Sequence, residues 1–149
     1  MVTIKTTQRN IKFNVEKLKS SARSALALLD YHDFALNILL TTNNSIQAYN
    51  KKFRNIDKPT DILSFPFYPD LKPGERIIPE VEDDRQLGDI IISLEYVREQ
   101  LKELKTTMDE QLLVLLVHGI CHLIGYDHET DDEFKQMQER ELWLLEHLR

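Results

Sequence analysis

The stretch of sequence that decides the fold is Thr107-Met-Asp-Glu-Gln-Leu-Leu-Val-Leu-Leu-Val-His-Gly-Ile-Cys-His-Leu-Ile-Gly125. Thr107 and Glu110 have the spacing of a capping box, which marks the start of a helix. The run 112–117 is apolar all round and is therefore typical of a helix that is buried on most of its faces. Gly125 stands where a helix commonly ends in a left-handed residue. The rest of the chain is expected to pack around this helix.

The sequence before this helix alternates between strand and helix patterns. Strands are expected near residues 2–8, 34–40, 62–67 and 87–92, and helices near 14–29, 46–53 and 94–104. After it, Thr130 and Glu133 form a second capping box that opens a terminal helix. The apolar face of that helix consists of Phe134, Met137, Leu144, Leu145 and Leu148. This order predicts an α/β fold with α+β-like character: a four-stranded, mostly parallel mixed sheet with helices packed on it.

The length and composition fit one domain covering residues 1–149. Hydrophobic residues make up 42% and charged residues 30%, which is too apolar for a disordered chain and too charged for a membrane protein. The N-terminal residues lack an apolar signal region and the single cysteine is Cys121, so a cytoplasmic location is expected. The net charge of −6 repels polyanions, so contact with nucleic acid requires a local basic patch.

All five prolines lie between Pro59 and Pro79, which predicts a long loop rather than a helix. Acidic residues follow between positions 80 and 84, so the far end of this loop is expected to be solvated. Loops of this length are usually functional or disordered. Two interpretations stay open: a lid over the functional site, or a plain solvated excursion.

Three histidines at the end of the buried helix predict a metal centre. His118 and His122 are one turn apart on one helix face, about 6 Å along the axis, and the reversal at Gly125 can return His128 as a third ligand. Three neutral imidazoles with an open fourth position suit one Zn²⁺ per chain, which lowers the pKa of its bound water to about 7. A hydrolase is therefore the leading hypothesis.

The single cysteine, the two other histidines and the residue after His118 indicate which kind of metal site and which kind of hydrolase to expect. A structural zinc site usually has four ligands, often thiolates, and Cys121 lies on another side of the helix, so we expect it to be a small buried hydrophobic residue. His32 and His147 have no ligand spacing and are expected outside the site. The histidine spacing resembles the long zincin protease motif, but Gly119 stands where that motif has its general-base glutamate. A packing role for Gly119 is expected, and peptidase chemistry is disfavoured.

Three separate blocks of sequence resemble the YbeY family of bacterial rRNA maturation endoribonucleases. They are Arg54-Asn-Ile-Asp-Lys-Pro-Thr-Asp-Ile-Leu-Ser-Phe-Pro66, Leu87-Gly-Asp-Ile-Ile-Ile92 and His118-Gly-Ile-Cys-His-Leu-Ile-Gly-Tyr-Asp-His128. The resemblance implies an α/β fold around a four-stranded mixed sheet, a zinc ion, and single-strand endoribonuclease activity in 16S rRNA 3′-end maturation and ribosome quality control. It also implies rRNA of the small ribosomal subunit and ribosome-associated proteins as partners, with neither DNA nor a membrane. Cys121 departs from the pattern, which usually has leucine there.

The expected site residues follow from the resemblance. His118, His122 and His128 are the expected metal ligands, and Arg54 and His118 are the expected catalytic residues. Arg54 ends a helix with nearby lysines, and its planar guanidinium can hold a phosphate with two hydrogen bonds. It could also serve only as a favourable cation at a helix C-terminus.

Two acidic residues and two alternative functions stay open. Asp89 is interpreted equally well as a residue that orients a ligand or substrate and as part of a turn. For Glu141 a structural bracing role is favoured over a role as hydrogen-bond partner of a metal ligand. A metallopeptidase and a non-catalytic ribosome-associated factor with a structural metal are the alternative functions. The nucleophile, water or the 2′-hydroxyl of the RNA, is not determined by the sequence.

Overall fold

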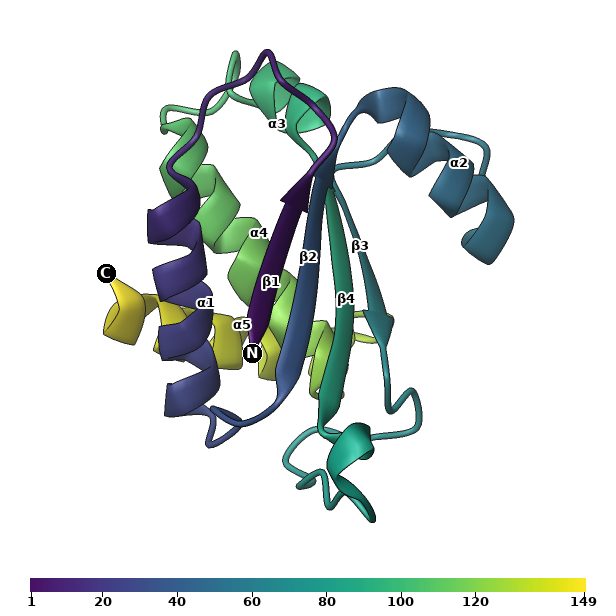
Figure 1. The fold of residues 1–149 in the computed structure, drawn as a ribbon, viewed down its shortest axis with the longest axis vertical. Coiled ribbons are helices and arrows are strands. Elements are labelled where there is room, and N and C mark those ends of the chain that lie inside the picture. The colour runs from purple at the N-terminus through teal and green to yellow at the C-terminus, as the bar shows by residue number, and fades with distance from the viewer.

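A computed structural model describes all residues, 1–149, and contains a four-stranded sheet with five α-helices (Figure 1). In chain order the elements are β1 (Val2–Thr6), α1 (Val15–Leu28), β2 (Ala35–Thr41), α2 (Asn43–Arg54), β3 (Ile62–Pro66), β4 (Gln86–Ser93), α3 (Leu94–Gln100), α4 (Met108–Leu123) and α5 (Asp131–Leu148). The strand order is β1-β2-β4-β3, with β1, β2 and β4 parallel and β3 antiparallel to β4. The predicted α/β fold, with a mostly parallel mixed sheet, is confirmed.

The helices begin where capping residues predict. The side chains of Asn14, Ser93, Thr107 and Thr130 each accept the backbone N–H of the third residue that follows. These bonds satisfy donors that the first helical turn leaves without partners. For α4, however, only the threonine half of the capping box forms, because the Glu110 carboxylate pairs with Arg149 instead.

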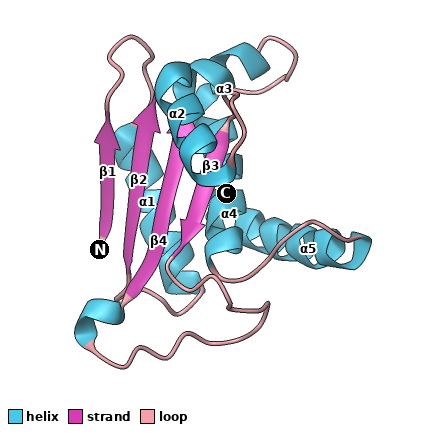
Figure 2. Ribbon diagram, turned by 90° about the vertical axis from the view of Figure 1, so that its right-hand side faces the viewer, coloured by secondary structure: helices cyan, strands magenta, loops and turns pink.

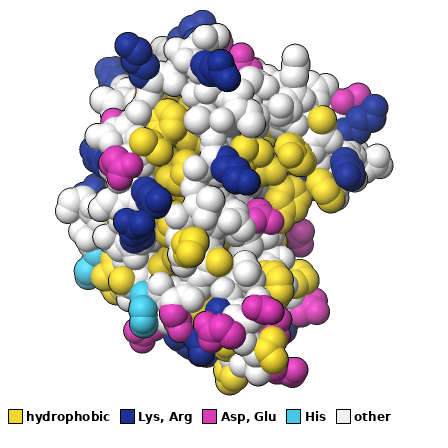
Figure 3. Space-filling model, in the orientation of Figure 1, with side chains coloured by type: hydrophobic (Ala, Val, Ile, Leu, Met, Phe, Trp, Pro, Cys, Tyr) yellow, Lys and Arg dark blue, Asp and Glu magenta, His cyan; other side chains and the backbone are white.

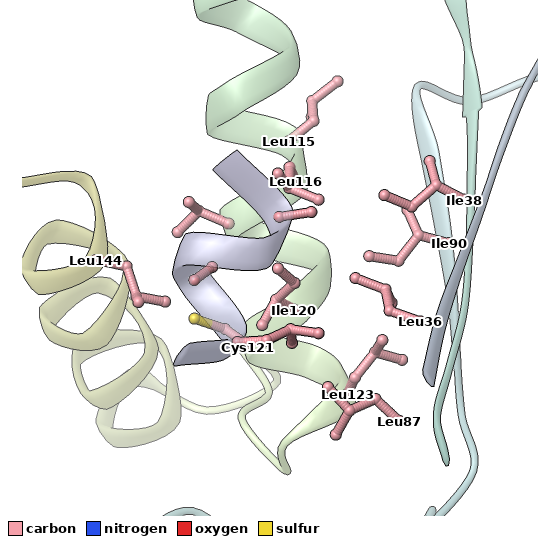
Figure 4. Packing of buried hydrophobic residues seen from close by; sticks show 14 of the residues in the cluster. Leu36, Ile38, Leu87, Ile90, Leu115, Leu116, Ile120, Cys121, Leu123 and Leu144 are labelled. Atoms are coloured by element: carbon pink, nitrogen blue, oxygen red, sulfur yellow. The ribbon is translucent and has the colours of Figure 1, made fainter. Parts of the chain in front are cut away.

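Helix α4 lies between the sheet and two other helices. In Figures 1 and 2, α1 and α4 lie on the same side of the sheet, with α5 beyond α4. Figure 4 shows the sheet residues Leu36, Ile38 and Ile90 facing Leu116 and Ile120 of α4. All five of these side chains are at most 2% exposed. The expectation that this helix is buried on most of its faces is confirmed. No helix of the chain has the length and apolar character needed to cross a membrane.

Gly119 lets α4 approach the sheet closely. A Cβ at this position would lie 2.8 Å from Cδ1 of Ile90 and 3.1 Å from Cδ1 of Ile62. A side chain at this position would force the ends of Ile90 and Ile62 to shift out of their close packing. The packing role predicted for Gly119 is therefore confirmed, and it explains a glycine inside a helix, where it costs about 1 kcal/mol relative to alanine.

The opposite face of the sheet is covered only in part, by α2 (Figure 2). Figure 3 shows hydrophobic side chains gathered in the hollow between the sheet and α2. Tyr49 and Phe53, which share helical spacing with Ile46 in the expected helix near residues 46–53, are 36% and 56% exposed, and the centre of the Phe53 ring lies 5.3 Å from that of Phe65. On the expected apolar face of α5, Met137 and Leu144 are buried, whereas Phe134 is 55% exposed.

The strand that the sequence predicts near residues 62–67 is present as β3, and the long proline-rich loop follows it. The loop runs from residue 67 to 85, with a 3₁₀ turn at Glu82–Asp84. Pro66 is tolerated because β3 is an edge strand, where a missing N–H donor costs little. The loop is tied to the body of the protein at Ile77, which is buried, and by the Tyr68 hydroxyl, which donates to the carbonyl of Asp84. It is therefore not a plain solvated excursion over its whole length.

Candidate metal centre

His118, His122 and His128 converge at the C-terminal end of α4. One nitrogen of each ring lies within 4.8 Å of a nitrogen of both others, a geometry in which the three side chains could hold one metal ion. Nε2 of His118 and Nε2 of His122 are 3.2 Å apart. The first two rings come from successive turns of the helix, and the third comes from the loop that follows it.

The other ring nitrogen of each helical histidine is occupied. Nδ1 of His118 lies 3.0 Å from Oε2 of Glu141, and Nδ1 of His122 lies 2.9 Å from the carbonyl oxygen of Tyr126. Carboxylates and carbonyls only accept hydrogen bonds, so in the neutral rings both Nδ1 atoms carry the hydrogen and both Nε2 atoms carry a lone pair. Two lone pairs then face each other across 3.2 Å. A cation between them removes that repulsion, so the donor set fits a metal ion.

The turn after α4 delivers His128 to this position. Gly125 has a φ of +104°, which L side chains rarely adopt, and the N–H of Tyr126 bonds back to the carbonyl of Cys121 at 3.0 Å. The Asp127 carboxylate then accepts the backbone N–H of His128 at 2.8 Å. The positive φ predicted for Gly125 is confirmed.

The surroundings of His122 keep its ring neutral. Burial, followed by the neighbouring rings of His118 and His128, lowers the pKa of His122 from 6.5 to about 4. The charged form loses solvation when it is buried and is repelled by other protonated imidazoles. A neutral imidazole is the form that binds metal ions. The site is therefore prepared for a metal at neutral pH.

The lowered pKa of His122 predicts how acid affects the metal-free protein. Between pH 6.5 and 4 the unfolded state binds a proton at this residue that the folded state excludes, so the contribution of His122 to the free energy of unfolding falls as the pH falls through this range. We expect the thermal midpoint of chelator-treated protein to drop more from pH 7 to pH 4.5 than that of the His122→Asn variant. Equal drops in the two proteins would contradict the prediction.

The three histidines open into a cavity of about 540 Å³. Its walls come from the end of α2, from β3, and from the loops on either side of the histidines. Arg54 lines the same cavity as His118, His122 and His128. Arg54 and His118 are 64 positions apart in the sequence, and the fold therefore brings them to the same cavity.

Arg54 is held at the edge of the cavity by β3. Its Nη2 donates to the carbonyl of Ser64 at 2.8 Å, and its Cζ lies 5.7 Å from the centre of the Phe65 ring. No carboxylate pairs with Arg54, while a guanidinium has five N–H donors. The exposed side chain is oriented and still has donors for an anion in the cavity.

Comparison with known proteins identifies the relatives of this chain. The family model described as endoribonuclease YbeY matches residues 3–149. The chain belongs to the YbeY family. The human protein named endoribonuclease YbeY is 37% identical over 147 residues, which cover 99% of this chain and 87% of that protein. The protein of that name from Sulfurihydrogenibium sp. is 45% identical over 116 residues, 78% of this chain and 70% of that protein.

The fold of this YbeY-family chain also resembles a solved structure. The solution structure of a protein from Thermotoga maritima matches with a TM-score of 0.56 and 24% sequence identity, covering 99% of this chain and 91% of that one. This likeness concerns the fold alone. The membership in an endoribonuclease family identifies a nuclease, a hydrolase whose substrate is RNA, and not the metallopeptidase that the histidine spacing resembles.

The single cysteine and the two other histidines of this YbeY-family chain lie outside the three-histidine cluster. Cys121 is fully buried, which raises the pKa of its thiol, and it packs in the core as expected. His32 is exposed, and His147 bonds to the carbonyl of Trp143 outside the cavity. Neither residue belongs to the group of three histidines that could hold a metal ion.

The structure bears on the two acidic residues whose roles the sequence left open: Asp89 lies away from the histidine cavity, and Glu141 contacts a histidine of the cluster. Ile90 faces α4, so its neighbour Asp89 points to the other face of the sheet, where it accepts a hydrogen bond from Asn37 at 3.0 Å. It orients nothing in the histidine cavity. Glu141 was interpreted mainly as a structural brace, yet its carboxylate contacts the ring of His118.

Sequence reasoning missed the roles of Asp61, Tyr126 and Asp127. Asp61 lines the cavity, and its carboxylate accepts from the backbone of Ile62 and from Gln100. Tyr126 acts through its carbonyl, which no side-chain pattern reveals. Asp61 and Asp127 both belong to blocks that carry the family resemblance, and that location was the available signal.

Proposed function

We propose that residues 1–149 form a single domain that acts as a zinc-dependent endoribonuclease on single-stranded RNA. His118, His122 and His128 hold one zinc ion through ring nitrogens, and Arg54 and His118 are the catalytic residues, the latter as a ligand. The observation that carries this proposal is the shared cavity: the three convergent imidazoles and the exposed guanidinium line one opening in a chain of an endoribonuclease family.

The ligand set favours zinc over magnesium. Imidazoles suit zinc and other transition metals, whereas magnesium and calcium prefer oxygen ligands. When bound with an open position, zinc polarises a phosphoryl oxygen or lowers the pKa of a water molecule. Three protein ligands are typical of catalytic zinc sites, and four of structural ones.

Arg54 is proposed to bind the phosphate of the scissile bond. The Ser64 carbonyl and the Phe65 ring hold its guanidinium in place before substrate arrives, so little side-chain entropy is lost on binding. A fixed cation beside the reacting phosphate stabilises the negative charge that develops during cleavage. The same cation also offsets the overall charge of −6 where RNA must approach.

The finer biological assignment is also a proposal. We infer that the substrate is 16S rRNA near its 3′ end, that the protein acts in ribosome quality control in the cytoplasm, and that ribosome-associated proteins are partners. DNA and membranes are not proposed partners. The sequence resemblance supports this assignment, and the exposed Lys51, Lys52 and Lys58 form a local group of basic residues close to Arg54 in the sequence.

One experiment tests the activity and the metal together. Highly purified protein is assayed on a single-stranded RNA, on the same RNA with one 2′-deoxy nucleotide at the cleavage site, and on DNA, with zinc content measured on the same sample. We expect about one zinc per chain and RNA cleavage that stops after chelation and returns with zinc. A 2′,3′-cyclic phosphate product indicates attack by the 2′-hydroxyl, and its absence indicates water. Cleavage that persists without any metal would refute the proposal.

Arg54→Ala is expected to slow RNA cleavage about 100-fold, the usual cost of losing one group that stabilises developing charge. Zinc content should stay at the parent value because Arg54 contacts no histidine, and the thermal midpoint should change little because the side chain is exposed and loses one hydrogen bond, to the Ser64 carbonyl. Arg54→Lys should recover only part of the rate, since lysine keeps the charge and loses the planar two-pronged geometry. Arg23→Ala, on the exposed side of α1, is the control. Unchanged cleavage by Arg54→Ala would leave Arg54 as a helix-end cation only.

A further inference from the structure

Glu141 reaches the histidine cluster from a helix that does not line its cavity. Oε2 of Glu141 lies 3.0 Å from Nδ1 of His118, 23 positions earlier in the chain. The two side chains are only 23% and 27% exposed. α5 packs along α4, and this packing brings the carboxylate to the side of the His118 ring that faces away from Nε2.

The carboxylate has no other hydrogen-bonding partner. The contact with His118 is the only hydrogen bond and the only ion pair of Glu141. A partly buried carboxylate loses solvation, and this loss is offset only by a donor of good geometry. A brace between two helices would not require a charged group aimed at an imidazole nitrogen.

We propose that Glu141 is a positioning residue for the metal ligand His118. It accepts the Nδ1–H of the ring, which fixes the tautomer that leaves the lone pair on Nε2 and sets the rotation of the ring toward the ion. Carboxylate partners of this kind also make the imidazole a stronger donor to the metal. This inference rests on the proposed metal centre.

The two helical histidines then differ in donor strength. His122 has a neutral partner, the backbone carbonyl of Tyr126, which is present whatever the side chain at that position. Only His118 has a charged partner, and only this partner can be removed by mutation. The pair therefore offers an internal comparison: loss of Glu141 should weaken the contribution of His118 and leave the orientation of His122 intact.

The test measures binding of zinc and cobalt to the purified protein, independently of RNA cleavage. Glu141→Met keeps the length of the side chain and removes the acceptor, and Glu141→Gln keeps a neutral acceptor. Glu139→Met is the matched control, because Glu139 is exposed on the same helix and contacts no histidine. Zinc affinity is measured by competition with a chromophoric chelator, and the Co²⁺ absorption spectrum reports the ligand field.

We expect zinc affinity to fall about 10- to 100-fold in Glu141→Met, the usual cost of losing such a partner, and less in Glu141→Gln. The cobalt spectrum should change in both variants and stay at the parent form in Glu139→Met. Zinc affinity of Glu141→Met equal to that of the parent would overturn the proposal. If this variant does not fold, Glu141→Gln decides: parent affinity with a parent cobalt spectrum overturns the role of the carboxylate. Failure of the parent itself to bind zinc would instead refute the metal centre.

Discussion

His122→Ala is expected to abolish zinc binding and RNA cleavage together. The substitution removes one of three ligands, so the loss should exceed the roughly 10- to 100-fold cost of removing a partner that only supports a ligand. It also leaves His118 and His128 with no third nitrogen to complete the cluster. Zinc affinity by chelator competition and single-turnover cleavage of a single-stranded RNA measure the two effects on one preparation.

The control for this prediction is the same substitution at an exposed histidine. His32→Ala should match the parent in metal content and cleavage, because His32 lies outside the cavity. The metal-free forms of parent and His122→Ala should both be folded, since the core of α4 is made by other side chains. If His122→Ala cleaved RNA at the parent rate after its zinc was removed, the cluster would not be the active site.

Much of the fold was predictable from local signals. Several features of α4 could be recognised from residues close to them in the sequence. They are its apolar run, the cap at its start and the glycines at 119 and 125. An all-apolar run must be buried, a threonine cap satisfies free N–H groups, and a positive φ favours glycine. For that reason α4 and its turn agree with the sequence interpretation almost residue by residue.

Other features depend on what lies across the molecule and were therefore misjudged. Tyr49 and Phe53 have helical spacing and face the hollow between α2 and the sheet, but no further element covers this hollow, so they remain partly exposed. The prolines between Pro59 and Pro79 predict one continuous loop, but the strand expected near residues 62–67 interrupts it, because an antiparallel edge strand accepts Pro66. The side of the sheet on which Asp89 lies follows from strand register, which no local pattern determines.

The same reasoning applies to the candidate site. The ligand triad lies within one helix and its following turn, so spacing alone was sufficient to propose it. The contact between Glu141 and His118 joins two helices, and only the packing of α5 on α4 places them together. Arg54 was proposed through family resemblance, and its place in the histidine cavity depends on where β3 and the end of α2 lie in the fold.

Gly125→Val is expected to damage the metal centre without changing a ligand. A β-branched residue is strained at the observed φ of +104°. The structure adds a second obstacle that the sequence did not reveal: a Cβ on Gly125 would lie 2.7 Å from the carbonyl oxygen of Leu71 and 2.8 Å from the carbonyl carbon of Lys72. These are backbone atoms, so a rotamer change cannot relieve the contact.

Two results are consistent with this strain, and they are distinguished by measuring zinc affinity and thermal midpoint on the same variant. If the turn relaxes, His128 withdraws, zinc affinity falls at least about tenfold, and RNA cleavage falls with it. If the turn keeps its shape, zinc stays bound and the thermal midpoint drops, because strain at such a position costs about 1–3 kcal/mol before the clash with the loop is counted.

Gly74→Val is the matched control: Gly74 also has a positive φ, +83°, but no atom lies within 4 Å of its Cβ position, and it lies outside the histidine cavity. It should lose stability from backbone strain alone and keep parent zinc affinity. A Gly125→Val protein with the zinc affinity and thermal midpoint of the parent would refute the role of this turn.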